Sequence, residues 1–171
     1  KILPYSTGAL VDPHDLKPDA IRIVDIAHAL FNICRYTGHL RYPYSVAQHT
    51  VLVSRLVPEA HARWGRLHDA SEASLNDGAH PRKLTTGFKQ YREWEDDAMR
   101  VICEVFGLDP HMPEEVIEVD RKLARTEMHY LSNYDAGPDV GVDTYIMDLS
   151  PWSPGYAEAE FLKRFNELTG A

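Results

Sequence analysis

The sequence predicts an all-α fold, a compact bundle of five or six helices in a single domain over residues 1–171. Apolar residues recur at spacings of three and four along most of the chain, which is the period of a helix with one buried face. The pattern lacks the helix–strand alternation of a parallel sheet. A chain of 171 residues fits one domain and can bury roughly 70% of its unfolded surface, enough for a full core.

The beginning of the chain predicts a lead-in and two helices. The first 18 residues are expected to be extended or hairpin-like, because prolines and a glycine interrupt them. A helix is expected from about Asp19, with an apolar stripe at residues 23–34 and a stop at Gly38. The next helix begins at Ser45, a good N-cap, and has its stripe at residues 46–56.

Four more helices are expected further along the chain. The third stripe covers residues 64–75 and is closed by Asn76-Asp77-Gly78, which is typical of a turn. The fourth covers residues 88–105 and ends at Gly107, and the last two cover residues 116–131 and 157–168. Residues 136–156 hold three prolines and three glycines, so they are expected to form a long ordered loop or a lid.

The composition excludes several classes of function. A net charge of −8 disfavours binding to a nucleic acid polymer or an anionic membrane, so a small soluble partner is expected. Cys34 and Cys103 lie far apart and form no CxxC pair, which suits a reducing compartment such as the cytoplasm. We expect neither a bilayer-spanning run nor a signal segment. Nine histidines against two cysteines favour imidazole chemistry.

Three predicted helices have an ionisable residue where the period requires an apolar one, namely His49, His68 and Asp120. A lone buried carboxylate costs several kcal/mol, and a cation shared with the two histidines would compensate Asp120. Asp69 follows His68 directly, and Glu72 lies one helical turn further. Two interpretations stay open: a metal site, or buried histidines with ordinary hydrogen bonds and an aspartate paired to Arg121 or Arg125.

The run His68-Asp69-Ala70-Ser71-Glu72, with a histidine upstream and an aspartate downstream, resembles the H…HD…D signature of the HD-domain metal-dependent phosphohydrolases. The segment is most similar to that of the bacterial 5'-deoxynucleotidases and the related phage deoxynucleoside triphosphate hydrolases, a likeness to which Asp77, Pro81 and Lys83 contribute. The resemblance covers about residues 20–130. It implies an HD-domain helical bundle.

The resemblance also implies a role for each matching position. The metal ligands would be His49, His68, Asp69 and Asp120, holding a divalent transition metal such as Mn, Co, Fe, Ni or Zn, with Mg as a further option. Glu72 would be the catalytic acidic residue. Asp77 would hold the substrate or the nucleophile, unless it is only a turn residue. Arg35 and Lys83 would contact the substrate phosphate, unless they are solvated surface charges.

The expected activity is therefore metal-dependent release of phosphate from a deoxynucleoside monophosphate, in the cytoplasm, or in the host cytoplasm for a phage protein. The alternative within the enzyme class is a phage-type deoxynucleoside triphosphate (dATP-type) triphosphohydrolase. Alternatives of other classes are a nucleotide-binding module without turnover and a helical interaction domain. The partner would be a small nucleotide, and the family resemblance implies a homo-oligomer.

Overall fold

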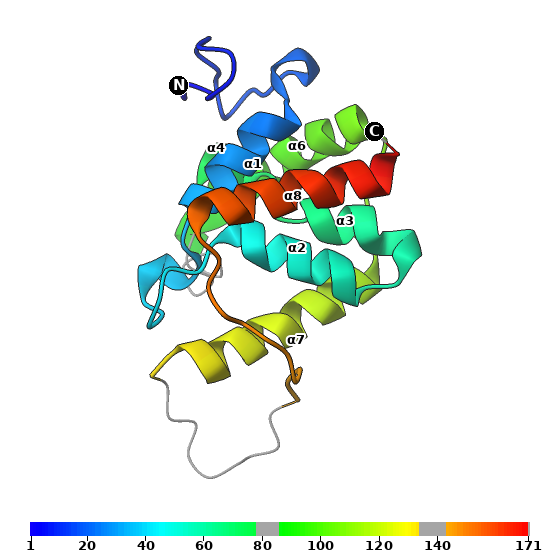
Figure 1. Ribbon diagram of the computed structural model, residues 1–171. Helices are drawn as coiled ribbons and strands as arrows, with labels where there is room; N and C mark the ends of the chain where they lie inside the picture. The colour runs from blue at the N-terminus through cyan, green and yellow to red at the C-terminus, as the bar shows by residue number, and fades with distance from the viewer. Residues whose placement is uncertain (78–85, 134–142, 171) are drawn as a thin grey trace.

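The computed structural model describes residues 1–77, 86–133 and 143–170. The expected all-α architecture is confirmed, because the regular elements of these residues are helices (Figure 1). The longer ones are α1 (Ile23–Asn32), α2 (Val46–Leu56), α6 (Lys89–Phe106), α7 (Glu114–Leu131) and α8 (Pro154–Thr169), and the shorter ones are α3 (Ala62–Leu67) and α4 (Glu72–Leu75). None of the described helices is long and apolar enough to cross a membrane.

The lead-in has the expected hairpin-like form. Ile2 and Val11 form an isolated antiparallel bridge, in which each backbone N–H donates to the other residue's carbonyl oxygen at 2.8 and 2.9 Å. The predicted stop of the first helix at Gly38 is wrong, because α1 already ends at Asn32. Extended residues follow, and Cys34 bridges to Ser45 across the connection, so the backbone groups that would continue the helix are used elsewhere.

The predicted third helix is two helices. α3 ends at Leu67 and α4 begins at Glu72, and the N–H groups of Ala70 and Glu72 bond three residues back, to Leu67 and Asp69. These tight turns carry His68 and Asp69 at the point where the chain leaves α3. Because an apolar stripe of period three to four fits both an α-helix and such turns, the sequence pattern did not separate them.

The expected ends of two helices are confirmed by their caps. The Ser45 hydroxyl accepts a hydrogen bond from Gln48 N (3.2 Å) at the start of α2. Gly107 closes α6 with a φ of 62°, a left-handed conformation that glycine adopts at little cost. α4 ends at Leu75, its C-cap Asn76 has a φ of 69°, and the Tyr91 hydroxyl of α6 donates to the Asn76 carbonyl oxygen (2.6 Å).

α2 is the central helix of the bundle. It packs against α1, α3, α7 and α8, and residues 46–54 are all buried (Figure 1). Two apolar clusters meet on it, one with α1 and α8 and the other with α3 and α7. Polar side chains on such a helix must find partners inside the protein, since an unsatisfied buried polar group costs about 1–3 kcal/mol.

Gln48 has such partners in the chain before α8. Its Nε2 donates to the Ser150 carbonyl oxygen (3.0 Å), and its Oε1 accepts from Trp152 N (2.9 Å). Residues 143–153 of the predicted loop contain no helix or strand, as expected, its last three residues are helical, and residues 136–142 lie outside the described part of the chain. α8 begins at Pro154, within the predicted loop, because proline suits the first turn of a helix.

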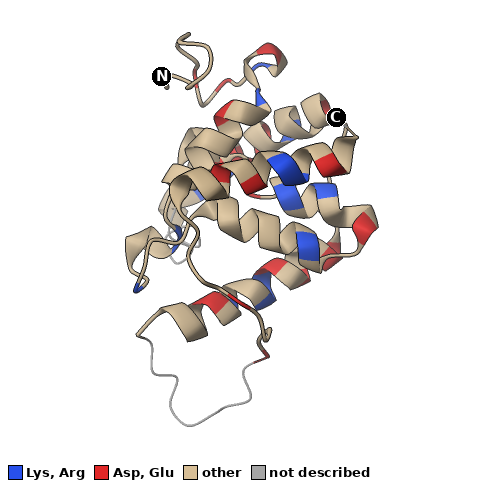
Figure 2. Ribbon diagram, viewed as in Figure 1, with Lys and Arg blue, Asp and Glu red and all other residues tan. Residues whose placement is uncertain are grey.

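Charges of both signs alternate on the outer helices. Figure 2 shows basic and acidic residues side by side along α8, where Arg164 pairs with Glu167 (3.3 Å) and Glu160 pairs with Arg55 of α2 (2.6 Å). These arginines are therefore neutralised locally, in ion pairs that each have one exposed and one largely buried partner.

Candidate metal centre

Two histidines and two aspartates from three parts of the chain meet beside α2. His49 comes from the middle of α2, and His68 and Asp69 come from the turn after α3. One ligand atom from each of these three residues lies within 4.8 Å of the other two, so the group could hold a metal ion. Asp120 of α7 adds an oxygen 3.0 Å from His49 Nε2 and 3.8 Å from His68 Nε2. All four residues predicted as ligands are therefore brought together.

Each imidazole is oriented through its Nδ1 atom. His68 Nδ1–H donates to the Gly65 carbonyl oxygen (2.8 Å), and His49 Nδ1–H donates to Glu127 Oε1 (2.7 Å). His49 Nε2 also lies 3.0 Å from Asp120 Oδ1, and a metal in place of the Nε2 proton would be bound by the ring's lone pair, which points toward the cluster. His68 Nε2 is buried and makes no hydrogen bond within the described residues, although Asp69 Oδ2 lies 3.3 Å away. This arrangement is typical of histidines that bind metals.

The carboxylates of the cluster stay ionised despite their surroundings. Burial alone would raise the pKa of Asp69, but His68, His49 and Arg35 hold it well below its usual range. The same two histidines lower the pKa of Asp120 in the same way. Burial alone would lower the pKa of His68. The charges of Asp69 and Asp120 outweigh the effect of burial, so the pKa of His68 is raised. The site therefore strongly favours positive charge.

Solvent reaches the cluster from its carboxylate side. The side chains of Asp69 and Asp120 are 20% and 34% exposed, whereas the two imidazoles are at most 3% exposed. Asp120 contacts the histidines, and no ion pair with Arg121 or Arg125 occurs among the described residues. The ligand set therefore has one face inside the protein and one face open to solvent.

Arg35, predicted to contact phosphate, lies at the inner edge of the cluster. Its Nε donates to Glu127 Oε2 (2.9 Å), and its Nη1 lies 3.5 Å from Asp69 Oδ2. Glu127 is fully buried on α7 and was not selected from the sequence. A signal was available, because Glu127 lies midway between Leu123 and Leu131 at helical spacing, on the stripe that faces the core.

The two predicted catalytic residues lie just beyond Asp69 in the chain. Glu72 is buried at the start of α4, one tight turn after Asp69, whose carbonyl oxygen accepts from Glu72 N (3.0 Å). Asp77 is half-buried and follows Asn76, whose side-chain oxygen accepts from Asp77 N (3.0 Å). Lys83, the second predicted phosphate contact, lies outside the described residues, as do Gly78 and Pro81.

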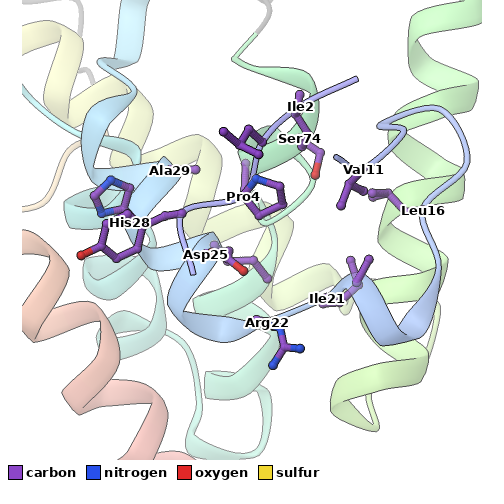
Figure 3. A pocket seen from close by; sticks show the side chains of 15 residues that line it. Ile2, Pro4, Val11, Leu16, Ile21, Arg22, Asp25, His28, Ala29 and Ser74 are labelled. Carbon is purple, nitrogen blue, oxygen red and sulfur yellow. The ribbon is translucent and has the colours of Figure 1, made fainter. Parts of the chain in front are cut away.

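A cavity of about 310 Å³ lies elsewhere, between the lead-in and α1 (Figure 3). Its walls are mostly apolar, and none of the cluster residues lines it. Two of its polar side chains are engaged with the protein: Asp25 accepts from Ser6 N and Ser6 Oγ, and the ring of His28 stacks on Tyr5. The cavity is therefore separate from the His–Asp cluster.

Relatives in two bacteria match most of the chain. A protein of Escherichia coli (strain K12), named uncharacterized protein YfdR, is 39% identical over 158 residues that cover 90% of this chain and 88% of YfdR. The chain belongs to the YfdR family. Uncharacterized protein RCAP_rcc00048 of Rhodobacter capsulatus is 36% identical over 141 residues, which cover 75% of this chain and 71% of that protein. No protein-family model matches the chain. The names of these relatives state no activity.

The distance between the two histidines of this YfdR-family protein depends on a close approach of α3 to α2. An added Cβ at Gly65 would lie 3.1 Å from Ser54 Cα, a backbone atom that cannot turn aside. Gly65→Ala is therefore expected to separate the helices, to lower the free energy of unfolding by about 1–3 kcal/mol and to weaken metal binding, because the Gly65 carbonyl also holds His68. Urea unfolding and metal titration measure the two effects.

Gly155→Ala is the matched control for that substitution. An added Cβ at Gly155 meets nothing within 4 Å, so this variant is expected to unfold and to bind metal as the wild type does. A Gly65→Ala variant as stable as Gly155→Ala would show that the close contact of α2 with α3 is not required.

Proposed function

We propose that this YfdR-family protein is a metal-dependent phosphohydrolase of the HD type that releases phosphate from a small deoxynucleotide. The observation that carries the proposal is the convergence of His49, His68 and Asp69 within 4.8 Å, with Asp120 beside them. Two imidazoles with their Nε2 atoms turned toward two carboxylates are a donor set for a divalent cation, and the set leaves an open side.

The local charge supports a divalent cation. With both imidazoles neutral, the form that binds a metal, the three carboxylates Asp69, Asp120 and Glu127 and the one guanidinium, Arg35, leave two negative charges. A divalent ion would balance both charges and would fill the coordination site at His68 Nε2. Mixed imidazole and carboxylate ligands suit Mn, Fe, Co, Ni or Zn better than Ca, with Mg as a further candidate.

The chain's own residues then have separate tasks in phosphate ester hydrolysis. When bound, the metal would supply a water of lowered pKa and would neutralise charge on the phosphoryl oxygens. Glu72, buried one turn after Asp69, would accept the proton of the attacking water. Arg35, with Nη1 3.5 Å from Asp69 Oδ2, would place positive charge beside the ligand set, and Lys83 would be the second phosphate contact.

The size and charge of the substrate follow from the same features. The carboxylate side of the cluster is the solvent-exposed side, and the whole chain carries a net charge of −8. A polyanionic nucleic acid would be repelled by this surface, whereas a nucleotide needs only the local site. A nucleoside monophosphate with one phosphate ester is the simplest substrate that fits these requirements.

A nucleotide panel tests the proposal. The purified protein is incubated with Mn²⁺ or Co²⁺ and with deoxy- and ribonucleoside mono- and triphosphates, and orthophosphate and tripolyphosphate are measured separately. Orthophosphate release from a deoxynucleoside monophosphate is the expected result. Tripolyphosphate release from a deoxynucleoside triphosphate would replace the assignment with a triphosphohydrolase. Nucleotide binding without any turnover would replace it with a binding module.

A further inference from the structure

We infer that Glu127 is a positioning residue that fixes the His49 ring for metal binding, and that Arg35 holds Glu127 in place. The inference rests on the proposed function, because it concerns the metal of that same site. Glu127 makes no direct contribution as a ligand in this scheme. It acts through His49. Glu127 Oε1 accepts a hydrogen bond from His49 Nδ1–H (2.7 Å), on the side of the ring opposite the cluster.

Because Glu127 is buried, its negative charge needs charged or hydrogen-bonding partners inside the protein. The side chain is fully buried, and its two oxygens face His49 Nδ1 and the Arg35 guanidinium. Taking a carboxylate from water into the interior costs several kcal/mol unless charged partners and hydrogen bonds compensate. Three donors provide that compensation: His49 Nδ1–H, Arg35 Nε–H at 2.9 Å and, at 3.5 Å, the Tyr36 hydroxyl.

The two histidines of the cluster are fixed by equivalent contacts of different origin. His68 is oriented by a backbone carbonyl, that of Gly65, whereas His49 is oriented by a side chain, that of Glu127. An acceptor at Nδ1 selects the tautomer with a lone pair at Nε2 and makes the ring a better ligand. Since a backbone carbonyl survives any substitution, Glu127 is the orienting group that mutagenesis can remove.

The backbone around Arg35 is shaped to support this arrangement. Tyr36 and Thr37 have φ values of 53° and 55°, a left-handed conformation that is unfavourable for residues other than glycine. The strain is offset by contacts with α7, where the Tyr36 hydroxyl donates to the Ala124 carbonyl oxygen (2.6 Å) one turn before Glu127. Arg35 N also donates to the Tyr44 carbonyl oxygen (2.9 Å). These bonds direct the Arg35 guanidinium onto Glu127.

The test measures Co²⁺ binding to the full chain and needs no substrate. Wild type, Glu127→Gln and Glu158→Gln are titrated with Co²⁺ by calorimetry, and the visible absorption of the bound cobalt is recorded. Glu158→Gln is the matched control, because it also removes a carboxylate from a histidine Nδ1, that of His28 at 3.3 Å, on α1 and α8. Circular dichroism and thermal unfolding report whether each variant is folded.

The expected result is a loss of about 10–100-fold in Co²⁺ affinity for Glu127→Gln, with altered cobalt bands, and no change for Glu158→Gln. Equal affinity and equal bands in folded Glu127→Gln would overturn the role of Glu127 while leaving the metal site intact. Absence of Co²⁺ binding to the wild type would overturn the proposed function and this inference together. If Glu127→Gln does not fold, Glu127→Asp is used in its place. This variant keeps the charge beside Arg35 but shortens its reach to His49, and the same two outcomes apply to it.

Discussion

Asp69→Ala is expected to abolish metal binding and phosphate release together. Asp69 Oδ2 lies 3.3 Å from His68 Nε2, 3.9 Å from His49 Nε2 and 3.5 Å from Arg35 Nη1, so it is shared by the other groups of the cluster. Its removal deletes one ligand and one of the charges that attract a cation. Since substitutions of outer contacts already cost 10–100-fold in metal affinity, loss of a ligand should cost more than about 100-fold.

Asp97→Ala is the control for this prediction. Asp97 is an exposed aspartate on α6 that pairs with Arg100, outside the cluster, and its removal should leave metal content and turnover unchanged. Metal content is measured by elemental analysis after dialysis, and turnover by phosphate release. An Asp69→Ala protein that kept its metal and its turnover would remove Asp69 from the site and with it the proposed role of the His-Asp pair.

Glu72→Gln is expected to separate turnover from metal binding. The amide keeps the shape of the buried Glu72 side chain, but it cannot accept a proton from water. Turnover should fall about 10²–10⁴-fold, the usual contribution of a general base, while Co²⁺ affinity and thermal stability stay near those of the wild type. Steady-state kinetics and cobalt titration on the same preparation give both quantities.

The Glu158→Gln protein serves again as the control, because it replaces a part-buried glutamate that lies outside the cluster. It should retain full turnover. A Glu72→Gln protein with wild-type turnover would exclude Glu72 as the base. A loss of metal together with turnover would instead make Glu72 part of the metal site.

Local sequence signals predicted those parts of the fold that are set by local chemistry. Ser45 caps α2 and Gly107 closes α6 as expected, since a capping hydroxyl and a left-handed glycine act within one turn of the chain. The early end of α1 was not predicted, because it depends on Cys34 pairing with Ser45 across a connection. The break between α3 and α4 was missed because its tight turns preserve the apolar period.

The cluster was predicted in outline because buried charge is visible in a helical pattern. His49, His68 and Asp120 each interrupt an apolar stripe, and the structure brings the three side chains together with Asp69. Glu127 met the same criterion and was overlooked. Its pairing with Arg35 depends on the left-handed backbone at Tyr36 and Thr37, which no local sequence signal indicates.

Metal dependence of turnover is the most direct test of the central proposal. The protein is stripped with a chelator, and phosphate release from deoxynucleoside monophosphates is followed as Mn²⁺ or Co²⁺ is added back. We expect no turnover in the stripped protein and full recovery at about one equivalent of metal per chain. Undiminished turnover in the presence of the chelator, or no turnover at any metal concentration, would contradict a metal-dependent phosphohydrolase.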